Sequence, residues 1–177
     1  MGSYFHWIKA SIIGLISFTR QLRFNISMLA DRLIGATKGI KENYDDNFKI
    51  GYFGASTGGG AALEAAAKNP YLVKAVVSRG GRPDLAGNYL YSVKAATLLI
   101  VGGLDYHVIE LNNQALKNLN CQKKMVIVPG ATHLFEEPGK LEEVANLAKE
   151  KAITAHISFS KRYFPDNITP GYYFSAF

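Results

Sequence analysis

The sequence predicts an α/β fold, in which a mostly parallel sheet of about four strands is flanked by helices. Two observations carry this prediction. Four short apolar runs alternate with segments of helical periodicity, and continuous apolar runs are typical of parallel strands buried on both faces. A glycine-rich or polar turn follows each run, and these turns hold the candidate functional residues. The four runs are Ile50–Phe53, Val73–Ser78, Ala95–Val101 and Met125–Val128.

Composition limits the classes of protein to consider. The 177 residues suffice for one domain, and 48% hydrophobic and 19% charged residues describe a globular chain. The net charge is +6, but the basic residues are scattered, so nucleic-acid binding is not expected. The single cysteine, Cys121, excludes an internal disulfide and fits a reducing compartment, so a cytoplasmic location is expected. No Cys/His cluster has metal-ligand spacing.

Three segments differ in character: an apolar segment (1–21), the patterned region (22–152) and an irregular, aromatic-rich tail (153–177). The apolar stretch Tyr4–Phe18 is shorter than the roughly 20 residues that span a bilayer. We expect it to form a docked helix; a membrane-surface anchor and a sequence foreign to the domain are the alternatives.

The helices are predicted from apolar residues that recur every three or four positions. The first helix begins at Asn25 or Ser27, either of which can cap it. A second follows Gly58, and a loosely patterned connection covers Leu85–Lys94. Two further helices complete the pattern, one marked by Val108, Ile109, Ala115, Leu116 and Leu119, the other by Leu141, Val144, Ala145 and Ala148.

The segment Gly54-Ala55-Ser56-Thr57-Gly58 joins a strand to a helix and has the pattern Gly-x-Ser-x-Gly. In this context the pattern indicates a nucleophile elbow, a strained turn that exposes the serine hydroxyl. The backbone N–H of Thr57 would then face a developing oxyanion at the positive end of the helix. Glycine-rich turns between a strand and a helix also bind phosphate, but the phosphate-binding motif Gly-x-x-x-x-Gly-Lys-[Ser/Thr] is not present here. The other alternative is a purely structural turn.

Asp105 and His133 follow two other predicted strands, so parallel strands would bring both to the same sheet edge as Ser56. Ser56 would attack, His133 would accept its proton, and Asp105 would orient the imidazole. Each residue has an alternative reading. Asp105 could cap the following helix, and His133 could be a loop histidine bonded to backbone. His107 is a rival base, expected to be exposed, and Asp84 is a rival acid.

Arg79 and Arg82 flank a Gly-Gly turn after the second strand. They are candidates for holding an anionic group of a substrate. The alternative is that both guanidinium groups simply face solvent.

The stretch Arg23–Lys149 resembles the C-terminal half of an α/β-hydrolase of the dienelactone hydrolase-like group, of the kind found alone or fused to a phosphoribosyltransferase. The resemblance rests on IGYFGASTGGGAALEAA, VVSRGGRPDLAG, TLLIVGGLD and VPGATHLFEEPGKLEEVA. It implies that Ser56, Asp105 and His133 occupy triad positions. Dienelactone hydrolases proper carry cysteine as nucleophile, so Ser56 implies esterase-like chemistry on a small-molecule acyl substrate, without a cofactor. No phosphoribosyltransferase phosphate-binding motif is evident.

Family members have further strands before the helix at Asn25, one of which supplies a second oxyanion donor; in this chain Tyr4–Phe18 stands there instead. The nucleophile strand is therefore expected at a sheet edge, open to homo-oligomer formation. Loss of one oxyanion donor costs on the order of 100- to 1000-fold in rate. The leading hypothesis is a serine hydrolase. The alternatives are an impaired, truncated hydrolase that acts as a self-associating or interaction module, and a protein held at a membrane surface through Tyr4–Phe18.

Overall fold

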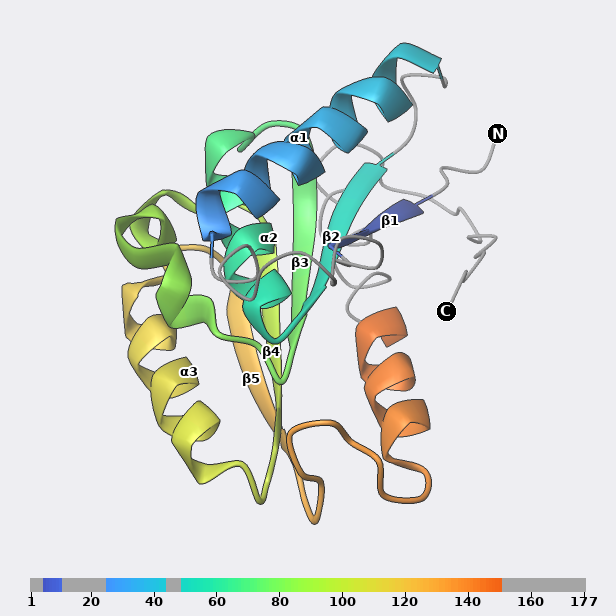
Figure 1. The fold of residues 1–177 in the computed structure, drawn as a ribbon, viewed down its shortest axis with the longest axis vertical. Coiled ribbons are helices and arrows are strands. Elements are labelled where there is room, and N and C mark those ends of the chain that lie inside the picture. The colour runs from blue at the N-terminus through green and yellow to red at the C-terminus, as the bar shows by residue number, and fades with distance from the viewer. Residues whose placement is uncertain (1–4, 11–24, 44–48, 151–177) are drawn as a thin grey trace, which may run out of the picture.

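A computed structural model of the chain describes residues 5–10, 25–43 and 49–150. Its centre is a sheet of five parallel strands in the order β1-β2-β3-β4-β5, so that each strand pairs with the next one along the chain (Figure 1). The α/β class and all four predicted strands are confirmed, and the structure adds a fifth. The strands are β1 (Phe5–Ala10), β2 (Lys49–Ala55), β3 (Val73–Arg79), β4 (Ala96–Gly102) and β5 (Lys123–Val128).

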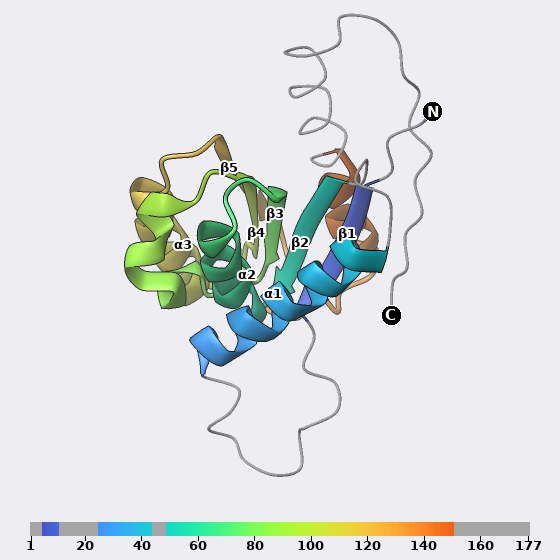
Figure 2. The same ribbon diagram turned by 90° about the horizontal axis from the view of Figure 1, so that it is seen from above.

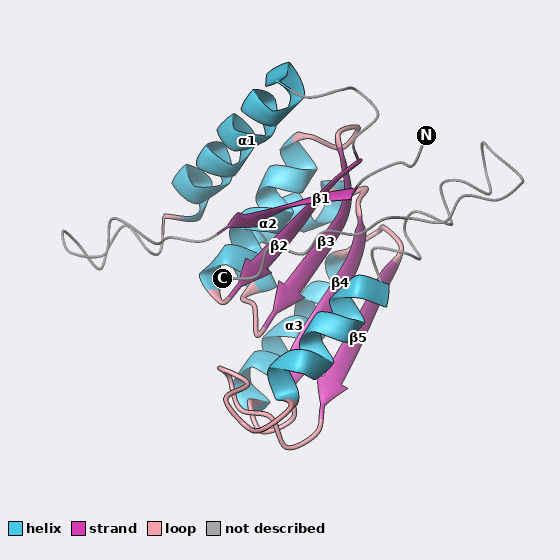
Figure 3. Cartoon of the chain, turned by 90° about the vertical axis from the view of Figure 1, so that its right-hand side faces the viewer, coloured by secondary structure: helices cyan, strands magenta, loops and turns pink. Residues whose placement is uncertain are grey.

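Helical segments connect the strands and cover both faces of the sheet (Figures 2 and 3). One apolar core lies between the sheet and α1, α2, η2 and α3, and the other lies against a helix at 140–150. Neighbouring residues of a strand point to opposite faces. Leu99 of β4 therefore enters the first core, while Leu98 and Ile100 enter the second. The helical segments are α1 (Ile26–Asn43), α2 (Thr57–Lys68), the 3-10 segment η2 (Pro83–Ser92) and α3 (Tyr106–Asn118).

Helix α1 begins where its sequence predicts. The Asn25 side-chain oxygen accepts a hydrogen bond from the Met28 backbone N–H at 3.0 Å, which is an N-cap contact. Further along, the Thr37 hydroxyl donates to the Leu33 carbonyl, so the buried Tyr52 hydroxyl donates to Thr37, at 2.7 Å. This contact links α1 to β2, and burial raises the pKa of Tyr52.

The N-terminal apolar stretch gives the main correction. Residues 5–10 form strand β1 and pair with β2 from Phe5–Lys49 to Ala10–Gly54, so the expected docked helix is wrong for them. Strand β2 consequently has a neighbour on each side, β1 and β3, and is not a sheet edge. The remainder of Tyr4–Phe18 lies outside the described residues, as does the tail 153–177. Within the described ranges, no helix is both long and apolar enough to cross a membrane.

Candidate active site

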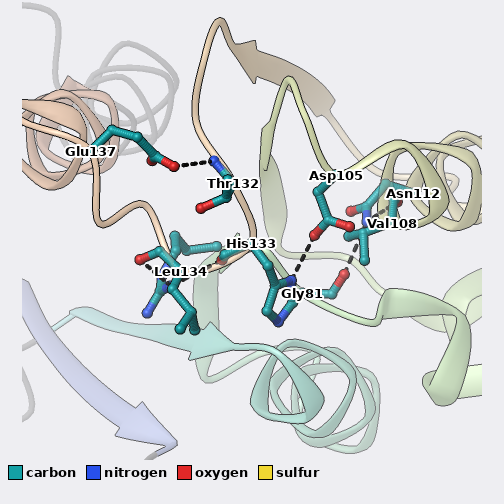
Figure 4. A network of polar contacts seen from close by, with 9 residues as sticks. Gly81, Asp105, Val108, Asn112, Thr132, His133, Leu134 and Glu137 are labelled. Carbon is teal, nitrogen blue, oxygen red and sulfur yellow. Dashed lines mark hydrogen bonds and ion pairs between the residues drawn. The ribbon is translucent and has the colours of Figure 1, made fainter.

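Three candidate residues follow the carboxyl ends of three strands. Ser56 directly follows β2, Asp105 lies three positions after β4, and His133 lies in the loop after β5. Parallel strands present their carboxyl ends at one edge of a sheet, where α/β proteins bind ligands. The prediction that these turns converge is supported directly for one pair, since Asp105 Oδ2 lies 2.6 Å from His133 Nδ1 (Figure 4).

Ser56 occupies a strained turn. Its φ of 50° and ψ of −125° place it in a region that L-residues rarely adopt. Backbone hydrogen bonds hold this conformation: the Ser56 N–H donates to the Arg79 carbonyl at 3.3 Å, and the Ser56 carbonyl accepts from Gly59 at 3.0 Å and from Arg82 at 2.9 Å. Thr57 is the first residue of α2, and the first N–H groups of a helix lack intrahelical acceptors. The strained backbone at Ser56, directly between β2 and α2, agrees with the nucleophile elbow that the sequence predicts.

The elbow requires glycine at position 54. A Cβ atom there would lie 2.2 Å from the Gly58 carbonyl oxygen and 2.7 Å from the Gly59 nitrogen, both of which are backbone atoms. We therefore expect Gly54→Ala to lower the free energy of unfolding by about 2–3 kcal/mol, as overpacking does. Urea denaturation measures this change.

Gly35→Ala is the matched control for that substitution. Gly35 lies in the interior of α1, and a Cβ atom added there would have no neighbour within 4 Å, so alanine should raise the free energy of unfolding by roughly 0.5–1 kcal/mol. Equal effects of the two substitutions would contradict the proposed packing at the elbow.

The Asp105–His133 contact determines which imidazole nitrogen carries the proton. A carboxylate only accepts hydrogen bonds, so Nδ1 donates to Asp105 and Nε2 of the neutral ring keeps a free lone pair. The Asp105 side chain is 15% exposed and that of His133 is 40% exposed, so the acid is shielded while the imidazole is open to a reactant. Asp105 precedes α3 but makes no side-chain cap, so the capping alternative is wrong.

The rival residues take other positions. His107 is exposed on the first turn of α3, as expected. Asp84 accepts two hydrogen bonds from Arg82, from Nε at 2.9 Å and from Nη2 at 2.8 Å, so its carboxylate is engaged away from the imidazole. This pair raises the pKa of Arg82 and engages the Nε–Nη2 edge of its guanidinium.

Arg79 does not extend into solvent. Its side chain is half-buried, and Nη1 donates long hydrogen bonds to the carbonyl oxygens of His133, at 3.5 Å, and Leu134, at 3.4 Å. Burial lowers the pKa of Arg79. The guanidinium is therefore directed at the loop that carries His133.

Two polar residues that the sequence analysis did not select also hold this region (Figure 4). The buried Asn112 side chain donates to the Gly81 carbonyl at 2.9 Å and to Val108 at 2.8 Å, which ties α3 to the turn after β3. The Glu137 carboxylate accepts from the Thr132 N–H at 3.0 Å. Asn112 could have been found as a polar residue within the apolar spacing of α3, whereas nothing in the sequence marks Glu137.

We expect the contact between Glu137 and Thr132 to be lost in acid. Hydrogen bonding to Thr132 holds the pKa of Glu137 below its ordinary value of 4.5. A carboxyl group with a lowered pKa in the folded state stabilises that state above its ordinary pKa, and the contribution is lost as the pH falls through the lowered value. We expect the Thr132 amide resonance to titrate with a midpoint below 4.5, measured by NMR.

The titration should disappear in Glu137→Gln and persist in Glu136→Gln, because Glu136 is an exposed neighbour. A titration of the Thr132 amide that survives in Glu137→Gln would mean that another group controls this loop.

A groove lies apart from these residues. Its volume is about 660 Å³, and neither Ser56, Asp105 nor His133 lines it. The groove is therefore distinct from the strand-end site. Its lining comes from the start of α1, one residue of α2 and η2, namely Asn25, Ile26, Ser27, Glu64, Leu85, Ala86, Gly87, Asn88 and Tyr89.

The sheet, its helical layers and the strand-end turns have the fold of an α/β-hydrolase. More narrowly, the model of the dienelactone hydrolase family matches residues 20–164, and the chain belongs to this family.

Similar proteins agree with this assignment. The crystal structure of a dienelactone hydrolase from Anabaena variabilis is 59% identical, has a TM-score of 0.75, and is matched over 77% of this chain and 64% of that one. Est1E from Butyrivibrio proteoclasticus is 15% identical with a TM-score of 0.60 over 86% of this chain and 89% of its own, which shows the fold alone.

A curated relative from Mycobacterium tuberculosis, whose name proposes a phosphoribosyl transferase, is 58% identical over 126 residues. That match covers 71% of this chain and 28% of the relative. The chain thus spans less than a third of the length of this curated relative.

Proposed function

We propose that the chain is a serine hydrolase that cleaves an ester or a related acyl substrate through Ser56, His133 and Asp105. The observation that carries the proposal is the 2.6 Å contact of His133 Nδ1 with Asp105 at the strand edge that also presents Ser56 on a strained turn. A hydrolase of this kind needs a nucleophile, a base and an orienting acid, and these three groups supply them.

The reaction proceeds in two halves. Ser56 Oγ bonds to the acyl carbon while its proton passes to His133 Nε2, and the Thr57 N–H donates to the oxyanion. The tetrahedral intermediate collapses, the bond to the leaving group breaks, and His133 returns the proton to the departing oxygen. Water then repeats the sequence on the acyl-enzyme, which releases the carboxylic acid and restores the Ser56 hydroxyl.

The surroundings of the pair favour a substrate with an apolar part. Leu104 and Leu134, which flank Asp105 and His133 in the sequence, are 51% and 54% exposed. Exposed large apolar side chains at one edge supply contact area for an acyl or alcohol group without a charge of their own. A small-molecule ester fits such a surface.

Covalent trapping tests the proposal. We expect a serine-reactive fluorophosphonate to add one label, which mass spectrometry of the digested protein locates on Ser56. Labelling of the folded protein at another residue, or no labelling at all, would refute the assignment of Ser56 as nucleophile.

A further inference from the structure

One residue contacts both the Ser56 turn and the loop that carries His133. Arg79 is the last residue of β3, the strand next to β2. Its carbonyl oxygen accepts the hydrogen bond from the Ser56 N–H at 3.3 Å, and its guanidinium donates to the carbonyls of His133 and Leu134. Arg79 thus joins the elbow and the His133 loop, which no strand pairing connects directly.

The guanidinium also contacts an aromatic ring of the loop to which it donates. Its central carbon lies 5.5 Å from the centroid of the Phe135 ring, and Phe135 is fully buried with a φ of 59°. Among the described residues, Ser56 and Phe135 are the two non-glycine residues with positive φ. Backbone strain persists only where surrounding contacts impose it. Arg79 contacts the chain at both strained positions.

The residue after Arg79 allows the close approach. Gly80 has a φ of 51°, and a Cβ atom there would lie 2.9 Å from the His133 carbonyl oxygen. The Gly80 N–H donates to the Ile100 carbonyl at 2.7 Å, which fixes the turn against β4. The end of β3 is therefore shaped to receive the His133 backbone, with glycine making room and arginine supplying donors.

We propose that Arg79 is a positioning residue, which fixes the His133 backbone relative to Ser56 and so keeps the imidazole between Ser56 and Asp105. This inference rests on the proposed function. A guanidinium suits the task because its planar set of N–H groups reaches two carbonyls, its face packs on an aromatic ring, and its delocalised charge tolerates partial burial. A lysine at this position would carry a compact charge without the planar set of donors, and we expect it to bond to only one of the two carbonyls.

The test replaces Arg79 with methionine, which keeps the apolar stem, and with lysine, which keeps the charge. We expect kcat for p-nitrophenyl acetate to fall by about 10- to 100-fold in Arg79→Met, the size of effect that a misplacement near 1 Å produces. KM should stay within about twofold, and Arg79→Lys should recover part of kcat. Arg32→Met, which removes an exposed arginine of α1, is the matched control and should match wild type.

A second readout does not depend on activity. The His133 Nδ1 proton bonded to Asp105 should give a downfield NMR resonance in protein with isotope-labelled histidine. We expect it to broaden or vanish in Arg79→Met, to persist weakened in Arg79→Lys, and to stay unchanged in Arg32→Met. If Arg79→Met fails to fold, as judged by circular dichroism, Arg79→Lys decides the question.

The outcomes separate the two proposals. Unchanged kcat and an unchanged His133 resonance in the Arg79 variants would overturn the positioning role and leave the hydrolase assignment intact. A wild type without turnover whose His133 resonance still depends on Arg79 would overturn the reaction and keep the positioning role. A fall in kcat with an unchanged resonance would also refute positioning, because Arg79 would then act on the substrate directly.

Discussion

Replacement of Ser56 by alanine should reduce the turnover of p-nitrophenyl acetate by roughly 10⁴-fold or more, leaving only the rate that binding and the oxyanion donor provide. The reason is structural. Hydrogen bonds to the end of β3, to the loop after it and to the first turn of α2 hold the Ser56 backbone at a φ of 50°, and alanine removes the only hydroxyl that position 56 carries. Steady-state kinetics on purified variants measures the effect.

Ser92→Ala is the control for the loss of a hydroxyl group. Ser92 is exposed at the end of η2, and its alanine variant should keep wild-type kcat. Circular dichroism should show equal folding of both variants. A Ser56→Ala variant that keeps a tenth or more of wild-type turnover would mean that another group performs the attack.

Strands and elbow could be predicted from sequence because their signals are local. Consecutive residues of β2 to β5 are apolar, because the side chains of each strand pack into one core on each face of the sheet. Likewise, Gly54 and Gly58 mark the elbow because the turn leaves no space for a side chain at Gly54. The Asp105–His133 contact agrees with the expectation, based on strand direction, that these turns meet at one sheet edge.

Strand β1 could not be predicted in the same way. A short apolar run such as Phe5–Ala10 is compatible with either a helix or a strand when it is read alone. What decides it is parallel pairing with β2, a partner far along the chain that no local pattern reveals. The expected edge position of the nucleophile strand is wrong for the same reason, because β2 lies between β1 and β3.

The supporting contacts of the site were also beyond sequence reasoning. The sequence marks Arg79 as a candidate for binding an anionic group or for facing solvent, whereas its guanidinium donates to carbonyls of the loop after β5. The Arg82–Asp84 pair is a contact between residues two apart that depends on the start of η2. Such contacts depend on loop conformation, which residue types do not fix.

Asp105→Asn should lower kcat for p-nitrophenyl acetate by roughly 10⁴-fold with little change in KM. The carboxylate accepts the Nδ1 proton, whereas an amide group can present N–H donors to that nitrogen. The ring would then carry its proton on Nε2, where it can no longer accept the Ser56 proton. The orientation of the imidazole survives, but its function as a base is lost.

The rival acid provides the comparison for this experiment. Asp84 is bonded to Arg82 through both carboxylate oxygens, so Asp84→Asn should leave kcat within about threefold of wild type, a range that indirect effects of a lost ion pair can cover. The two substitutions make the same chemical change at carboxylates with different partners, His133 for Asp105 and Arg82 for Asp84. Equal losses would show that net charge near the strand edge matters more than the tautomer, whereas a large loss confined to Asp105→Asn would tie catalysis to the single contact between Asp105 and His133.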